Sequence, residues 1–269
     1  MTSEPVRVEM ADGVLRLVLD RPDHKNSLTP ESIRTLIEAL ERAATDDEAR
    51  VVWIESSGSD FCAGADVVLA NARDEGSARE RPRVGSIQRR TAVQAHRLID
   101  LMTTLQLPVV CSVRGWAAGL GCQMALAADF TIAAENATFW EPFVARGFTP
   151  DSGATWMLPR LIGIARAKAL LMLGEKIDGG HAADWGMIYR SVPEHDLDNV
   201  ARALVDRLAN GPTVALGLTK KSIQSGACAS LVESMATEAF ALELSSRTED
   251  FREGLASFRE RREPQFKGR

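Results

Sequence analysis

A valine-rich run, a glycine-bearing turn and an apolar helix follow one another between Pro108 and Asp129. Residues 109–113 predict a buried strand, and residues 123–128 are good helix formers. The turn between them contains Gly115, Gly119 and Gly121. The first amides of a helix have no acceptor inside it and carry a partial positive charge. The segment is therefore suited to bind an anion, either a phosphate or an oxyanion that develops during a reaction.

A second turn of similar design lies between Phe61 and Asp66, after the apolar run Val51–Ile54. Each turn follows a predicted strand and ends where a helix is predicted to begin. Two backbone amides, one from each turn, could converge on one carbonyl oxygen, and one such donor is worth roughly 3 kcal/mol to an oxyanion. The spacing leaves open the alternative that both are merely tight turns in an α/β fold.

Other kinds of chemistry lack their sequence signals. A dinucleotide fingerprint needs a third glycine where the chain has Met124, and no phosphate-loop lysine or Gly-x-Ser-x-Gly elbow occurs. Neither the histidines nor the cysteines show metal-ligand spacing: His24, His96, His181, His195, Cys62, Cys111, Cys122 and Cys228. We therefore expect no metal site, no bound redox cofactor and no serine nucleophile.

The composition is that of an ordinary globular protein, with 45% hydrophobic and 26% charged residues and a net charge of −5. No basic cluster stands apart from neighbouring acids, so we expect no nucleic-acid partner. Residues 1–7 contain no apolar run, so we expect neither a signal peptide nor a membrane partner. The unpaired cysteines favour reduced thiols and a cytoplasmic location.

The first part of the chain alternates predicted strands and helices. Residues 6–10 and 14–20 flank an Asp-Gly turn and predict a hairpin, and Thr29 with Pro30 predicts a helix start. A short helix is predicted over 67–70, and a polar surface loop over 71–86. Residues 87–105 then return to a helical period.

The last third of the chain is predicted to be nearly all helix. From residue 164 onward the only predicted strand is Met187–Val192, and no internal repeat interrupts the helical pattern. The sequence therefore predicts an α/β fold, with a core over residues 1–195 and a helical C-terminal region over residues 196–269.

Six segments in a fixed order resemble one known family, the crotonase (enoyl-CoA hydratase/isomerase) superfamily, over nearly the full chain. The segments are Asp20–Leu28, Phe61–Asp66, Pro108–Asp129, Leu158–Gly163, Ala183–Met187 and Phe258–Phe266. The resemblance implies a spiral of ββα repeats with a helical C-terminal trimerisation region. It also implies a homotrimer or hexamer and an acyl-CoA thioester as substrate, with coenzyme A as part of that substrate.

The same resemblance implies which residues hold the substrate. The amides of Ala65 and Leu120 would form an oxyanion hole for the thioester carbonyl. Substrate and coenzyme A contacts would come from Lys25, Ser27, Ala63, Asp66, Val67, Phe143 and Lys267, the last reaching the coenzyme A of a neighbouring subunit.

Two departures from the hydratase pattern bear on the reaction. Hydratases of this family use two glutamates to orient and split water, at the positions of Gln123 and Phe143. Glutamine does not exchange a proton at neutral pH, and phenylalanine does not hold a water. We therefore expect no ordinary two-glutamate hydration, although Gln123 could orient a thioester or a water by hydrogen bonding.

Asp151 lies where dienoyl-CoA isomerases and 4-chlorobenzoyl-CoA dehalogenase carry a catalytic aspartate. The dehalogenase branch also has a histidine at the position of His96 and an aromatic residue at the position of Phe143. That aromatic residue is a tryptophan that hydrogen-bonds the nucleophilic aspartate, whereas Phe143 has no donor. The alternatives are that Asp151 is only a helix N-cap and that His96 is a core histidine; Glu141 is expected at the surface or a subunit interface.

Three functions remain open from the sequence. The first is an acyl-CoA enzyme of the hydratase/isomerase family that uses Asp151 for proton transfer or water activation. The second is a dehalogenase-like or hydrolytic reaction on an aryl- or cyclic acyl-CoA, with Asp151 as nucleophile and His96 assisting. The third is a coenzyme A thioester-binding protein without catalysis.

Overall fold

The main sheet has six strands in the order β1-β2-β3-β4-β6-β9. The computed structural model describes residues 4–66 and 83–269 of the chain. β1 is antiparallel to β2, and each later neighbour is parallel. The strands are β1 (Val6–Ala11), β2 (Val14–Leu19), β3 (Val51–Ser56), β4 (Val109–Val113), β6 (Phe130–Ala134) and β9 (Arg190–Val192). The predicted N-terminal hairpin is confirmed, and the strand predicted over 187–192 is shortened to its last three residues.

A second sheet contains the short strands β5 (Trp116–Ala118), β7 (Thr138–Trp140) and β8 (Lys176–Asp178). β5 and β7 run parallel, and β8 runs antiparallel to β7. The chain passes from a strand of the large sheet to one of the small sheet and then to a helix, first as β4-β5-α5 and then as β6-β7-α6. This alternation is the predicted ββα repeat. The sequence did not predict β8, because three residues are too few to show a period of two.

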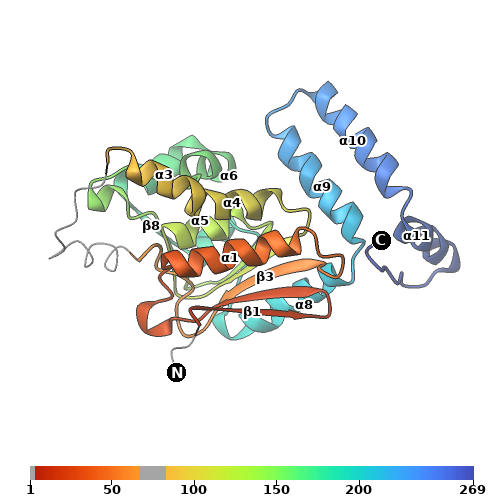
Figure 1. Ribbon diagram of the computed structural model, residues 1–269, viewed down its shortest axis with the longest axis horizontal. Helices are drawn as coiled ribbons and strands as arrows, with labels where there is room; N and C mark the ends of the chain where they lie inside the picture. Colours follow the sequence, from red (N-terminus) through yellow and green to blue (C-terminus); the bar gives the residue numbers. More distant parts are fainter. Residues whose placement is uncertain (1–3, 67–82) are drawn as a thin grey trace.

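Helices cover the sheets and extend beyond them (Figure 1). The α-helices are α1 (Pro30–Ala43), α3 (Ser86–Val93), α4 (Ala95–Thr104), α5 (Leu120–Ala127), α6 (Ala154–Lys168), α7 (Gly179–Asp184), α8 (Leu197–Ala209), α9 (Thr213–Gly226), α10 (Leu231–Ser245) and α11 (Glu249–Glu260). None of the helices that the structure describes has the length and apolar character that crossing a membrane requires.

Local sequence explains where these helices begin and end. The hydroxyl of Thr29 accepts from the amide of Ser32 at 3.0 Å, and Pro30 opens α1 as predicted. The helical period predicted over 87–105 is confirmed but forms two helices, because Gln94 has φ −118° and ψ −96° and separates α3 from α4. The short helix predicted over 67–70 lies outside the described residues, as does most of the loop predicted over 71–86.

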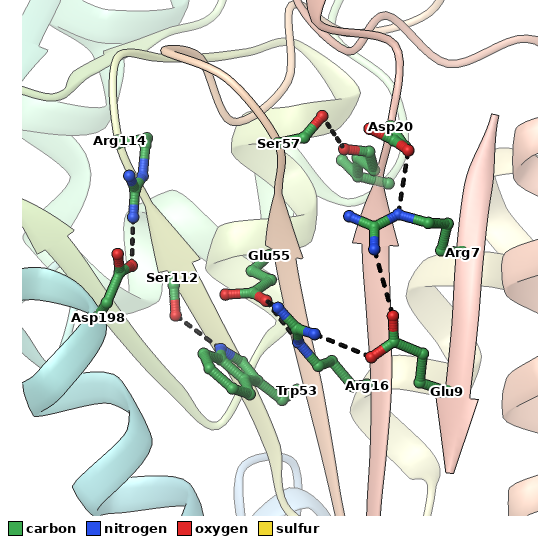
Figure 2. A network of polar contacts seen from close by, with 11 residues as sticks. Arg7, Glu9, Arg16, Asp20, Trp53, Glu55, Ser57, Ser112, Arg114 and Asp198 are labelled. Carbon is green, nitrogen blue, oxygen red and sulfur yellow. Dashed lines mark hydrogen bonds and ion pairs between the residues drawn. The ribbon is translucent and has the colours of Figure 1, made fainter. Parts of the chain in front are cut away.

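One face of the main sheet carries a polar network along β1 to β4 (Figure 2). Alternate side chains of a strand point to the same face of the sheet. On this face Arg16 of β2 lies between Glu9 of β1 and Glu55 of β3, and its guanidinium donates to Glu9 at 2.8 Å and to Glu55 at 2.6 Å. Trp53 of β3 donates its indole N–H to the Ser112 hydroxyl at 2.7 Å. Arg202 of α8 lies 4.7 Å from the centre of the Trp53 ring. The network thus joins four strands and attaches α8 to the sheet.

The C-terminal helices leave the sheet after α8 (Figure 1). Leu197, Ala201 and Val205 of α8 are fully buried in the main core. By contrast, α9 and α10 pack on each other as a helical pair, and α10 has no buried residue of its own. The division of the chain at residues 195 and 196 stays a prediction.

A buried ion pair fixes α9 to the core. The ammonium of Lys220 lies 2.7 Å from a carboxylate oxygen of Asp129, and it also donates to the carbonyls of Met102 at 2.8 Å and Leu107 at 3.1 Å. All three ammonium hydrogens are therefore used. The Asp129 carboxylate accepts from the amide of Val109 at 2.7 Å as well.

We expect Lys220→Met to lower the free energy of unfolding by about 3 kcal/mol, because removing one partner leaves the Asp129 charge buried and unpaired. Urea unfolding followed by circular dichroism measures the change. Lys221→Met at the exposed neighbouring position is the matched control and should change stability by less than about 0.5 kcal/mol. Equal effects of the two substitutions would contradict this account of the ion pair.

Candidate active site

The two glycine turns singled out in the sequence lie against each other. Residues 28 and 65 form one parallel bridge, and residues 62 and 117 form another. The amide of Leu28 donates to the Gly64 carbonyl at 2.8 Å, and the amide of Ala118 donates to the Cys62 carbonyl at 2.9 Å. Backbone hydrogen bonds therefore hold three loops together, the loop before α1, the turn after β3 and the turn after β4.

Glycine is required where these turns pack against each other. A Cβ on Gly64 would lie 2.7 Å from the Ala118 carbonyl oxygen, and one on Gly121 would lie 2.4 Å from that of Cys62. Both distances are far shorter than any normal van der Waals contact, so neither position has room for a methyl group. Gly64 has φ +92° in addition, a conformation that other residues rarely adopt.

This close approach brings together the amides of Ala65 and Leu120. A Cβ on Gly64, the residue before Ala65, would lie 3.6 Å from the Leu120 nitrogen. Leu120 is the first residue of α5, where an amide has no acceptor inside the helix. Within residues 4–66 and 83–269, neither amide donates to a backbone or side-chain acceptor. Two adjacent, unused N–H donors are the arrangement that stabilises a negative oxygen.

The segments predicted to contact coenzyme A are neighbours in the structure. The amide of Ala63 donates to the Lys25 carbonyl at 2.9 Å, and the hydroxyl of Ser27 donates to the Asp66 carboxylate at 3.3 Å. The Lys25 ammonium is exposed and lies 3.8 Å from the Asp60 carboxylate. Val67, also predicted to contact coenzyme A, lies outside the described residues.

Lys267 is placed elsewhere within the chain. Its exposed ammonium lies 3.6 Å from Glu249 at the start of α11, and its backbone amide donates to Asp250 at 2.7 Å. The single chain therefore does not bring Lys267 to the loops that hold Lys25 and Ser27.

Asp151 is exposed in the turn that leads into α6. The alternative that Asp151 is only a helix cap is wrong, because Gly153 occupies the N-cap position and α6 has no side-chain cap. Between them, Ser152 is buried with φ +49°, and its hydroxyl has no hydrogen-bond partner among the described residues. A buried serine in the left-handed region marks a turn held in place by its surroundings.

His96 is exposed near the N-terminus of α4, so the alternative of a core histidine is wrong. The buried side chains of α4 are instead Leu98, Ile99, Leu101 and Met102. Ile99, one turn after His96, lies 3.9 Å from where a Cβ on Gly153 would be. The same side of α4 thus faces the Asp151 turn, although no hydrogen bond joins His96 to Asp151 among the described residues.

Glu141 is a site residue that the sequence reasoning misplaced. It was expected at the surface or an interface, yet it is only 2% exposed, and Gln123 is completely buried. The Gln123 amide nitrogen donates to a Glu141 carboxyl oxygen at 3.4 Å. The side-chain oxygen of Gln123 and the second carboxyl oxygen of Glu141 have no hydrogen-bond partner among the described residues. Glutamate two residues after the aromatic Phe139 carries no sequence signal of burial, because charged residues are mostly exposed.

Burial controls the protonation of Glu141. It raises the pKa of Glu141 from 4.5 to about 8; the nearby Asp151 charge acts in the same direction, and hydrogen bonds from Cys122 and Gln123 oppose it. The pKa of the Cys122 thiol is raised well above its usual value of 9, by burial first and then by the Glu141 carboxyl. Near pH 7 the site therefore holds a neutral carboxylic acid beside an amide.

Near the two turns, the side chain of Phe143 is apolar and the thiol of Cys62 is unreactive. Phe143 is buried and packs edge-to-face with Phe148 at 5.3 Å between ring centres. Burial raises the pKa of the Cys62 thiol to about 12, so it is no nucleophile at neutral pH. Within the described residues, no three or more His, Cys, Asp or Glu side chains are grouped as metal ligands would be.

A spiral of ββα repeats with two backbone amides at the meeting point of two turns is the arrangement of a crotonase-type fold. The family model described as enoyl-CoA hydratase/isomerase matches residues 9–269, and the chain belongs to that family. It is 38% identical to 1,2-epoxyphenylacetyl-CoA isomerase of Escherichia coli K12, over 96% of each protein. It is 37% identical to a probable enoyl-CoA hydratase of Rhodobacter capsulatus, over the full length of both. The crystal structure of a putative enoyl-CoA hydratase from Streptomyces coelicolor has a TM-score of 0.91 at 31% identity, covering 98% of this chain and 94% of that one.

We expect Gly121→Ala to destabilise the protein by about 1–3 kcal/mol, because the added methyl group would force the two turns apart. Thermal unfolding and urea titration measure the loss. Gly254→Ala in α11 is the matched control, since its Cβ would lie 3.7 Å from the nearest atom and glycine is unfavourable inside a helix. That control should be neutral or stabilising by up to about 1 kcal/mol, and the reverse order of the two variants would contradict the close approach.

Stability should fall as the pH rises from about 4.5 to about 8. The folded protein holds the Glu141 proton up to a pKa of about 8, whereas the unfolded chain releases it near 4.5. The contribution is therefore complete below the unfolded pKa and is lost as the pH rises through the folded one. Glu141→Gln should remove a slope worth a few kcal/mol over this range, as measured by urea unfolding at several pH values. Parallel pH dependences of the two proteins would contradict a buried, neutral Glu141.

Proposed function

We propose that this protein is an acyl-CoA isomerase that moves a proton between two carbons of the acyl group through an enolate. The observation that carries the proposal is the adjacent pair of unused amides at Ala65 and Leu120. A thioester carbonyl oxygen bound there would receive two hydrogen bonds, and these strengthen as the oxygen becomes an enolate anion. The acidity of the neighbouring C–H bonds would rise accordingly.

Asp151 is the acid/base group in this proposal. Its exposed carboxylate is close enough to Glu141 to raise the pKa of that residue, which supports a place at the edge of the same site. Proton transfer can start from a carboxylate at position 151, whereas family hydration needs glutamates at the positions of Gln123 and Phe143. The similarity to the 1,2-epoxyphenylacetyl-CoA isomerase of Escherichia coli supports an isomerase over a hydratase.

The coenzyme A part of the substrate would lie along residues 25–27 and 63–67. The hydrogen bonds that join these two segments support this placement, because they form one continuous backbone edge beside the Ala65 amide. Coenzyme A is a part of the substrate here, and the proposed reaction needs no metal or redox cofactor. The buried thiols of Cys62, Cys111 and Cys122 support a cytoplasmic location.

A homotrimer or hexamer is the assembly that we infer. Exposed apolar side chains on α10 support it, because a helix with so many would otherwise face water: Leu231, Val232, Met235, Phe240, Leu242 and Leu244. Lys267, which lies apart from the site within one chain, would then reach the coenzyme A of a neighbouring subunit.

Asp151→Asn should lower kcat for isomerisation of 2-enoyl- and 3-enoyl-CoA thioesters by about 10²–10⁴-fold. The amide keeps the size of the side chain but cannot exchange a proton. Ultraviolet assays of the conjugated thioester measure the rate, and calorimetry with a saturated acyl-CoA should show unchanged binding. Asp206→Asn, on the exposed side of α8, is the control and should keep the wild-type rate.

The competing functions give different results. Wild-type rates in the Asp151→Asn variant would exclude this residue as the acid/base group. An acyl-aspartate trapped in a single turnover with an aryl-CoA substrate would establish the dehalogenase-like reaction. Binding of thioesters without turnover over the whole panel would establish a non-catalytic binding protein.

A further inference from the structure

We call residues 119–120, which end at the Leu120 amide, the oxyanion turn. It holds Glu141 in place through contacts with the residues before and after Glu141. The carbonyl of Trp140 accepts from the Gly119 amide at 2.9 Å, and the Pro142 ring lies 3.9 Å from where a Cβ on Gly119 would be. Gly119 is the residue directly before Leu120. Glu141 is therefore held opposite the donor turn by the residues on either side of it, although 21 positions separate it from Leu120 in the sequence.

The paired side chains of Glu141 and Gln123 have unused hydrogen-bonding capacity. Gln123 lies one helical turn after Leu120 on α5, and its amide nitrogen is spent on Glu141 at 3.4 Å. The free oxygen of Gln123 is an acceptor, and the free oxygen of a protonated Glu141 is a donor. Two buried oxygens without partners are costly, and such groups in native proteins call for a functional reason.

The surroundings of Glu141 favour a neutral acid over a carboxylate. Cys122 faces it from α5, and the Asp151 charge faces it from the turn before α6. The neighbours that shift the pKa of Glu141 are Cys122, Asp151 and Gln123, and none of them carries a positive charge. A carboxylic acid and a separate carboxylate beside one oxyanion turn form the pattern of an acid and a base assigned by environment.

We propose that Glu141 is a second proton-transfer group of this site, which exchanges a proton with the carbon next to the thioester carbonyl while Asp151 serves the more distant carbon. The proposal rests on the isomerase function above. Hydratases of the family have a carboxyl at position 123. In this chain position 123 is a glutamine, and the carboxyl hydrogen-bonded to it, that of Glu141, would take over the role.

In the conversion of a 2-enoyl into a 3-enoyl thioester, one proton leaves the γ carbon and one proton is added to the α carbon. The Asp151 carboxylate takes a proton from the γ carbon, and the electron pair of that C–H bond moves into the conjugated thioester. The resulting dienolate oxygen is held by the amides of Ala65 and Leu120. Glu141 then gives its proton to the α carbon, which restores the carbonyl. Return of one proton from Asp151 to Glu141 through solvent regenerates the enzyme, and no co-reactant is consumed.

The test compares wild-type protein with Glu141→Gln, using trans-2-hexenoyl-CoA in light and heavy water. We expect kcat to fall by about 10- to 100-fold with KM changed by less than about twofold. In the wild type, kcat should fall as the pH rises above about 8, and the variant should lack this limb. The deuterium found at the α carbon per turnover should also be lower in the variant.

A double variant separates proton transfer from a structural role. Gln123→Glu combined with Glu141→Gln keeps one carboxyl and one amide in the buried pair but moves the carboxyl to α5. We expect the kcat of the double variant to be at least about tenfold higher than that of the Glu141→Gln variant. If Glu141→Gln leaves kcat, the pH profile and the label unchanged while Asp151→Asn still abolishes activity, the role of Glu141 is overturned alone. A wild-type protein without isomerase activity would overturn the proposed function and this role together.

Discussion

The turn after β3 and the turn after β4 pack backbone against backbone, and the candidate chemistry depends on this contact. Two glycines with no room for a Cβ, Gly64 and Gly121, allow carbonyl oxygens of the opposite turn to pack against their Cα atoms. The amides of Ala65 and Leu120 are then left side by side with no acceptor of their own. Their geometry is set by main-chain packing rather than by mobile side chains, which is the requirement for a preorganised oxyanion site.

The rest of the fold supports that approach from two directions. β3 and β4 are neighbours in the main sheet, so the turns that follow them leave the same edge together. The short strands β5 and β7 then pair in the second sheet and fix the turn from its far side. This explains why a spiral with one strand in each sheet per repeat is suited to such a site, since each repeat delivers a turn and a helix start to the same edge.

The parts of this arrangement that follow from local sequence were predictable. Glycine spacing predicted both turns, the Asp-Gly turn predicted the hairpin, and Thr29 with Pro30 predicted the start of α1. The misplaced features depend on tertiary contacts. Glu141 is buried because the residues on either side of it contact Gly119, and no local pattern around residue 141 records that contact. The break at Gln94 and the three-residue strand β8 likewise have no periodic signal.

The burial of Glu141 also bears on why the reaction cannot be assigned from motif positions alone. A carboxyl acts at a point in space, and elements far apart in sequence can bring one to the same point. Position 123 holds an amide, yet that amide is hydrogen-bonded to a carboxyl from the segment after β7. The pair therefore retains one titratable group beside the turn after β4, and the exposed Asp151 adds a second from another element. Burial raises the pKa of Glu141, whereas Asp151 lies exposed in a different element, so the fold places the two carboxyl groups in different surroundings.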